Sequence, residues 1–217
     1  MKSIELTQSQ IKAKQAGATM FLFTIDNENI SIDSRNPDVF LSAYKFECSY
    51  CKGKDSQCTD CYGKGYRWDL DCESKEEFIA KYSPIQKGDK DIFVQEEFWQ
   101  YENDILYKSN SDLDEEMLLN GDYEPTSSFI WSNASKMTKE QSRYSFNECI
   151  DVIVVRVKDI TIESKIKIIG HINTNMELNK DAYNENFIYH YNQQMQEQNI
   201  NRTYKDKDYV FLVEFKR

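Results

Sequence analysis

The sequence lacks any apolar run long enough to cross a bilayer, which takes about 20 consecutive residues. Its first ten residues, MKSIELTQSQ, contain no apolar stretch followed by small residues, as a secretory leader would require. We therefore expect a cytoplasmic protein with no membrane partner. Thiols stay reduced in that compartment, so the six cysteines are not expected to form disulfides.

Glycine, proline and histidine are scarce, with seven, three and two copies among 217 residues. The two histidines, His171 and His190, are too far apart in the sequence to suggest a site. Positive charge is in deficit, and the formal net charge of −10 excludes wrapping of duplex nucleic acid by the overall field of the chain. Any contact with nucleic acid must come from a local basic patch.

Cysteine is concentrated in one short stretch that repeats a unit. The unit reads Cys-Ser-Tyr-Cys-Lys-Gly-Lys from Cys48 and Cys-Thr-Asp-Cys-Tyr-Gly-Lys from Cys58. Two thiolates at this spacing can converge on one metal ion, and the glycine that follows permits a positive φ that aims N–H groups at the sulfurs. Two such turns supply the closed four-thiolate shell of structural zinc. The predicted zinc ligands are Cys48, Cys51, Cys58 and Cys61.

Three other interpretations of this stretch are open: a pair of disulfides, a redox dithiol and an iron–sulfur cluster. The repeats look like the Cys-x-x-Cys-x-Gly-x-Gly units of J-domain co-chaperones, over this stretch alone. Cys72 is too distant in sequence to be an expected ligand. Cys149 lies beside an apolar strand and is predicted to be a buried, inert thiol.

The rest of the chain alternates predicted helices and strands. A capping box at Thr7–Gln10 opens a helix that ends at Gly17, Thr161 caps a helix over 162–169, and a third helix covers 184–198. Turns are predicted at 36–38 and 83–89. Predicted strands cover 20–25, 91–99, 105–108, 127–131, 150–158 and 209–215.

This pattern predicts an α+β fold: a small β-barrel flanked by helices, formed by a single domain over 1–217. The cysteine-rich segment is expected as an inserted zinc knuckle at 47–73.

Several segments recur in the order of a known family. Lys87–Trp99 is similar to a Gly-Asp-x-x-x-x-Val-Arg-Glu-x-Trp strand, and Trp131–Arg143 to a Trp-x-x-x-x-x-Met-x-x-x-x-Ser-Arg segment. The helix at Gln10–Gly17 and the last strand fall in the corresponding places. In this order the chain resembles the ASCH domain, a branch of the PUA-like superfamily, in the form common in phage genomes.

The resemblance implies a pseudo-barrel with a cleft beside the first helix, and PUA-like folds commonly bind RNA or nucleotides. Some ASCH proteins resemble amidohydrolases that act on acylated cytidine, with a Lys and a Thr after the first helix and the strand Glu. Carried over, these positions give Thr19 and Glu96 as candidate catalytic residues, while the Lys falls on Ala18. A Thr hydroxyl needs a neighbouring base or a Lys of lowered pKa. No Lys adjoins Thr19, so Glu96 is the only base that the motif leaves, and Lys14 would have to swing in from one helical turn before Gly17. We therefore expect hydrolysis to be lost or altered.

Binding is the leading functional expectation, with single-stranded RNA, a nucleotide or a modified nucleoside as the ligand. The knuckle carries a basic cluster with Tyr62 and Tyr66 interleaved, although its lysines could serve only to balance thiolate charge. A cleft with Trp99 and Tyr144 would add base stacking. The residues expected to contact nucleic acid are Lys52, Lys64, Arg67, Trp131 and Arg143.

A third possibility is a phage-type interaction protein that inhibits a host enzyme, its partner, through an acidic surface at 112–124. The alternative for that stretch is an ordinary solvated loop.

Overall fold

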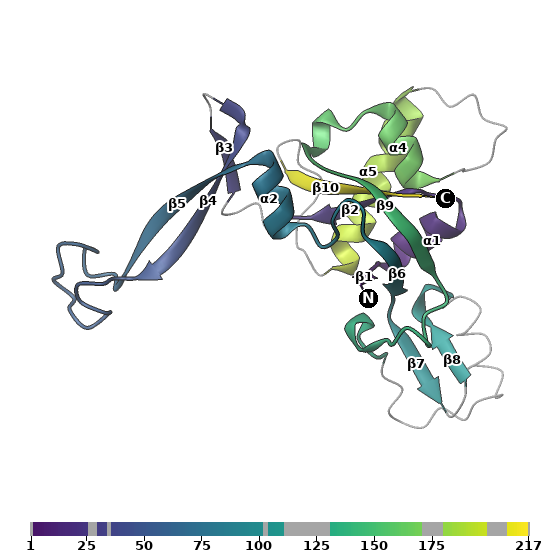
Figure 1. Cartoon of the computed structure of the whole chain (residues 1–217), viewed down its shortest axis with the longest axis horizontal. Coiled ribbons are helices and arrows are strands. Elements are labelled where there is room, and N and C mark those ends of the chain that lie inside the picture. The colour runs from purple at the N-terminus through teal and green to yellow at the C-terminus, as the bar shows by residue number, and fades with distance from the viewer. Residues whose placement is uncertain are drawn as a thin grey trace. The chain divides into compact units, whose positions relative to one another are not determined.

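The structure is a computed structural model that describes residues 2–25, 30–33, 36–101, 104–110, 131–170, 180–198 and 208–216. The chain is mixed α+β and divides into two compact units (Figure 1). The sheet unit consists of Met1–Phe23 and Pro84–Arg217, and the hairpin unit consists of Thr24–Ser83. The segment expected as the insert, 47–73, lies within the hairpin unit.

A five-stranded sheet forms the centre of the sheet unit, in the order β1-β6-β9-β10-β2. β1 pairs with β6 in parallel, and β9 pairs antiparallel with β6 and β10. The strands are β1 (Ser3–Glu5), β2 (Met20–Thr24), β6 (Lys90–Gln95), β9 (Ser145–Arg156) and β10 (Tyr209–Phe215).

The expected closed barrel is not found among the described residues. A barrel requires the two edge strands to pair. Here β1 and β2 lie at opposite edges of the sheet, and β1 has only three residues. The sheet is therefore open within the described part of the chain. The predicted α+β class is confirmed by the mixture of helices and strands.

Helices of this unit begin where the capping residues predict. α1 (Gln8–Gln15) starts at a complete capping box between Thr7 and Gln10, and α4 (Ile162–Ile169) starts after Thr161 and ends at Gly170. α5 (Lys180–Glu197) covers the third predicted helix. These predictions are confirmed.

The two faces of the sheet carry different side chains because neighbouring residues of a strand point to opposite sides. On one face, Met20 and Leu22 of β2 join a buried cluster with α4 and α5, which lie beside the sheet in Figure 1. On the other, Phe21 packs against Phe146 and Phe215, whose rings stack with centroids 3.8 Å apart.

The prediction of a single strand over 91–99 is wrong, because β6 ends at Gln95 and a new strand begins at Phe98. β7 (Phe98–Tyr101) leaves the main sheet and pairs with β8 (Asp104–Tyr107) as a separate two-stranded sheet. At the break, Glu96 is buried and takes part in an ion pair with Arg143.

The hairpin unit contains β3 (Ile30–Asp33), β4 (Asn36–Glu47), β5 (Tyr66–Ser74) and α2 (Lys75–Tyr82). β4 and β5 pair antiparallel from Val39↔Ser74 to Glu47↔Tyr66. The cysteine loop, which we define as residues 48–65, connects the ends of these two strands. α2 packs on β4 through the stacked rings of Phe40 and Phe78, 4.6 Å apart.

The predicted turn at 36–38 is also wrong, since these residues begin β4. β3 and β4 pair at Ile32↔Phe40 and then at Asp33↔Asn36, with a register shift between the two pairs. This irregularity tolerates Pro37, because a proline at a bulge or strand start removes no ladder hydrogen bond.

Candidate metal centre

The cysteine loop is closed at its base and folds as two similar turns. The Cys48 N–H donates to the Gly65 carbonyl at 3.0 Å, where β4 and β5 meet the loop. In each repeat, the residue three places after the second cysteine donates its N–H to that cysteine's carbonyl. These bonds are Lys54 to Cys51 at 2.8 Å and Lys64 to Cys61 at 3.0 Å.

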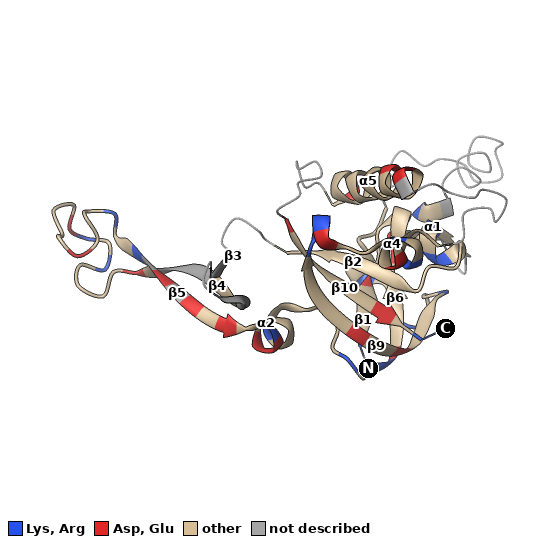
Figure 2. Cartoon of the chain, turned by 90° about the horizontal axis from the view of Figure 1, so that it is seen from above, with Lys and Arg blue, Asp and Glu red and all other residues tan. Residues whose placement is uncertain are grey.

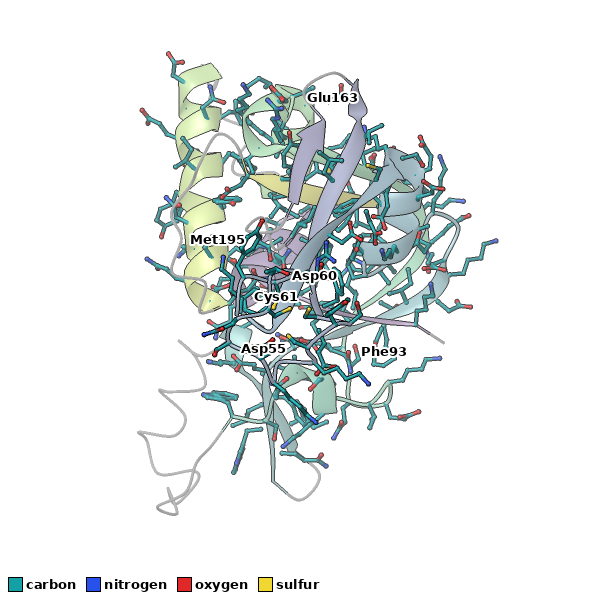
Figure 3. The ribbon with its side chains drawn as sticks, turned by 90° about the vertical axis from the view of Figure 1, so that its left-hand side faces the viewer. Asp55, Asp60, Cys61, Phe93, Glu163 and Met195 are labelled. Atoms are coloured by element: carbon teal, nitrogen blue, oxygen red, sulfur yellow. The ribbon has the colours of Figure 1, made fainter. Side chains whose placement is uncertain are left out.

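The four sulfur atoms gather at one point within this loop, beside the labelled Cys61 in Figure 3. All four Sγ atoms lie within 4.8 Å of one another. The Cys48–Cys58 and Cys51–Cys61 Sγ distances are 3.9 and 3.6 Å. A tetrahedral ion with bonds of about 2.3 Å to sulfur separates its ligands by about 3.8 Å, between these two values. The four cysteines can therefore hold a metal ion.

The sulfurs are not joined covalently. A disulfide bond is about 2.05 Å long, and all six cysteines are free. Cys149 is buried as predicted, and burial raises the pKa of its thiol to about 11. Cys72 is exposed on β5 and does not belong to the sulfur cluster.

Backbone N–H donors and burial have opposite effects on the pKa values of Cys51 and Cys61. Burial opposes ionisation of Cys51, but N–H groups of Gly53 and Asp55 and nearby thiols outweigh it and lower its pKa to about 7. For Cys61, burial dominates over the Gly65 N–H, 3.2 Å from its sulfur, and raises the pKa to about 11. The protein without metal thus retains thiol protons at neutral pH, and a bound metal ion must displace them.

Close approach of the two turns requires glycine. A Cβ at Gly63, where φ is +72°, would lie 2.2 Å from the Ser56 carbonyl oxygen, and one at Gly65 would lie 2.9 Å from Gly53 Cα. Gly53 itself has φ +74°, but a Cβ added there would meet no atom within 4 Å.

The outer surface of the loop presents aromatic rings and lysines. Tyr50 and Tyr62 are 85% and 86% exposed, one from each repeat. Arg67 pairs with Asp60 at 2.9 Å, so its charge is partly satisfied. Among the described residues, no ion pair engages the exposed side chains of Lys52, Lys54 and Lys64. Figure 2 shows both signs of charge in this loop and acidic residues along β5.

In the sheet unit, the structure brings together two other predicted site residues. Arg143 donates from Nε and Nη2 to the two carboxylate oxygens of Glu96, at 2.9 and 3.0 Å, and Ser109 Oγ donates to Glu96 at 2.6 Å. The guanidinium also lies over the rings of Tyr107 and Tyr144. Arg143 is therefore engaged by a buried carboxylate, which leaves little of its charge for a phosphate. Trp131 is half-buried beside the bridge from Ser132 to Phe98.

The predicted catalytic pair is not brought together, because each residue lines a different cavity at an end of α1. Glu96 lines a cavity of about 400 Å³ with Thr7 and Gln8 at the start of the helix. Thr19 lines a cavity of about 390 Å³ with Lys14 at the end of the helix. The first cavity also contains three further carboxylates and one lysine, so it repels anions. Its remaining charged lining residues are Glu5, Glu97, Glu197 and Lys108.

Several features escaped the sequence analysis. The exposure of Tyr50 and the role of Ser109 have no local signal. Three predicted features lie outside the described residues. They are the acidic stretch at 112–124, the expected strand at 127–131 apart from Trp131, and His171.

Comparison of the chain with protein-family models, with curated proteins and with solved structures finds no match. Among the described helices, none combines the length and the apolar character that a membrane crossing needs.

Proposed function

We propose that the cysteine loop binds one zinc ion and that zinc has a structural role. The fit of the two sulfur distances to a tetrahedron supports this, as do four thiolates with no position left open for water or substrate. Metal analysis of purified protein should give about one zinc per chain. Iron in its place, with visible thiolate absorbance, would contradict the choice of zinc and leave the ligand set intact.

On this zinc-stabilised loop we propose a binding surface for single-stranded RNA. The observation that carries the proposal is the pair of almost fully exposed rings, Tyr50 and Tyr62, beside the lysines of the loop. An exposed tyrosine offers a face on which a base can stack, worth about 1–3 kcal/mol per base. Folded zinc knuckles use such groups to contact single-stranded RNA.

Charge makes the smaller contribution to this surface. A zinc ion with four thiolates has a net charge of about −2, which the lysines of the loop partly offset. If Lys52, Lys54 and Lys64 each contact a phosphate, log K should fall with log salt with a slope of about −2. Binding should therefore persist at moderate salt better than binding by a strongly basic protein.

The test is fluorescence anisotropy with a labelled pyrimidine-rich RNA. The Tyr50→Ala and Tyr62→Ala double variant should bind at least tenfold more weakly because two stacking platforms are lost. The matched control is Tyr189→Ala, which removes a 59% exposed ring from α5 in the sheet unit. Charge reversal by Lys52→Glu and Lys64→Glu should weaken binding further and flatten the salt dependence. Equal affinity of the double tyrosine variant and wild type would refute the surface.

We further propose that the sheet unit is an ASCH-like, PUA-related domain. In its favour, α1, β6, β9 and β10 follow one another in the order of the resemblance. The motif positions Glu96 and Arg143 also contact each other. An experimental structure of the whole chain would test it, and an open sheet there would count against it.

A further inference from the structure

The cavity at the C-terminal end of α1 contains a lysine in an unusual setting. This cavity, of about 390 Å³, is lined by Lys14 from α1, Thr19 before β2, Phe146 and Asn147 from β9, and Lys216 after β10. It lies entirely within the sheet unit. Thr19 and Asn147 add polar groups to a lining that contains the stacked rings of Phe146 and Phe215.

The Lys14 amine contacts aromatic rings rather than a counter-ion. Its Nζ lies 4.0 Å from the centre of the Phe146 ring and 5.7 Å from that of Tyr144. Within the described ranges, no carboxylate pairs with this amine and no acceptor takes a hydrogen bond from it. Desolvation by burial lowers the pKa of Lys14, which increases the fraction of neutral amine.

Two other lysines of the sheet unit, Lys165 and Lys167, have polar partners. Lys167 pairs with Glu214 at 2.8 Å, and its pKa is raised by that contact. Lys165 has a pKa lowered by desolvation, like Lys14, but its amine donates to Asn184 Oδ1 at 2.8 Å. Lys14 therefore has a lowered pKa and lines a cavity, and no acceptor among the described residues takes a hydrogen bond from its amine.

We propose that Lys14 is an amine nucleophile that forms an imine with a small aldehyde or ketone carrying an acidic group. The neutral amine attacks the carbonyl carbon, and the carbonyl oxygen leaves as water with the two protons of the amine, so no oxidant or reductant is needed. Lys216 lines the same cavity and supplies positive charge for the acidic group, which must share this amine with Glu148, 3.8 Å away. Desolvation in an apolar setting is an established way to activate a lysine as such a nucleophile.

The test uses glyoxylate as the probe at neutral pH, with cyanoborohydride to trap the imine, and peptide mass spectrometry to locate the adduct. Lys14 should be modified several-fold faster than Lys12, an exposed lysine of the same helix. Lys14→Arg should abolish the dominant adduct, whereas Lys12→Arg and Lys165→Arg should leave it unchanged. Circular dichroism checks that each variant folds, and the Lys14 to Lys12 ratio in wild type needs no variant.

Modification of Lys14 at or below the rate of Lys12 would overturn the proposal. Propanal serves as a neutral probe for the acidic-group requirement. The Lys14 to Lys12 ratio should be higher with glyoxylate than with propanal, and Lys216→Ala should reduce the glyoxylate ratio. Equal ratios with both probes would overturn the role given to Lys216.

Discussion

At the scale of the residue, Gly63 is the position in the cysteine loop where one added methyl group meets the most resistance. It would lie 2.2 Å from a backbone oxygen, which cannot rotate away as a side chain would. Gly53 has nearly the same positive φ and open space around it. Comparing an alanine at Gly63 with one at Gly53 therefore separates the effect of a steric clash from that of left-handed backbone strain.

We predict that Gly63→Ala weakens zinc binding far more than Gly53→Ala does. Both variants incur about 1–2 kcal/mol of left-handed strain, and only Gly63→Ala must also push the two turns apart. Competition with a metal-binding indicator measures both affinities, and Gly63→Ala should lose at least tenfold more. Similar affinities would mean that the turns can separate without moving the sulfurs.

A second residue-scale prediction concerns the buried ion pair of Glu96 and Arg143. Glu96→Gln leaves the guanidinium without its counter-charge, at a cost of about 2–4 kcal/mol, which lowers Tm by about 5–12 °C. Glu97→Gln is the control, because Glu97 is 43% exposed in its pair with Lys108 and should cost about 0–1 kcal/mol. Thermal unfolding followed by circular dichroism compares them, and equal melting temperatures would contradict the asymmetry.

Spacing along the chain predicted the cluster of four cysteines because all four lie within one short loop. The relation between Thr19 and Glu96 depends on packing of segments far apart in sequence, and here the two line separate cavities. The same long-range packing directs Arg143 onto Glu96. No local pattern gives the outcome of such packing.

At the scale of the element, caps and periodicity predicted α1, α4 and β10 well. β5 was missed because its residues were assigned to the insert at 47–73, and α2, which follows the insert, was not predicted at all, although the signals for both are present. Tyr66–Ser74 alternates apolar and charged residues along most of its length, the pattern of a half-buried strand. Ser74 and Glu77 form the same capping box that identified α1. Barrel closure, in contrast, depends on distant strand edges and has no local signal.

The capping box of α2 should make stability depend on pH. Hydrogen bonds from the Ser74 N–H and hydroxyl lower the pKa of Glu77. A carboxyl whose folded pKa is depressed stabilises the protein above its unfolded pKa, and the contribution is lost as pH falls through the folded value. The free energy of unfolding, measured with urea, should therefore fall between about pH 5 and pH 3 more steeply for wild type than for Glu77→Gln. Glu76→Gln, in the same helical turn but outside the capping box, should behave as wild type does, and parallel profiles for all three would contradict the prediction.

At the scale of the whole molecule, the two compact units have different sources of stability. The sheet unit has an apolar cluster that joins β2 and β10 to α4 and α5. The buried cluster of the cysteine loop consists of Cys48, Cys58 and Cys61, with Cys51 against them. Ordering the loop residues costs conformational entropy, and burial of the cysteine sulfurs alone offsets little of it over 48–65. Binding of a structural zinc ion supplies folding free energy that such a loop otherwise lacks.

Removal of the metal should therefore unfold the loop and spare the sheet unit. After incubation with a strong chelator, limited proteolysis should cleave first within 48–65, while the thermal transition of the sheet unit stays within a few degrees. Cys58→Ser should reproduce this pattern without chelator, and Cys72→Ser should not, because Cys72 is exposed and outside the cluster. The affinity of the loop for zinc should also rise with pH. Because the pKa of Cys61 is about 11, this thiol stays protonated until the metal displaces its proton. Loss of both units together on chelation would show that the metal stabilises the whole chain, whereas an unchanged cleavage pattern would show that the loop folds without it.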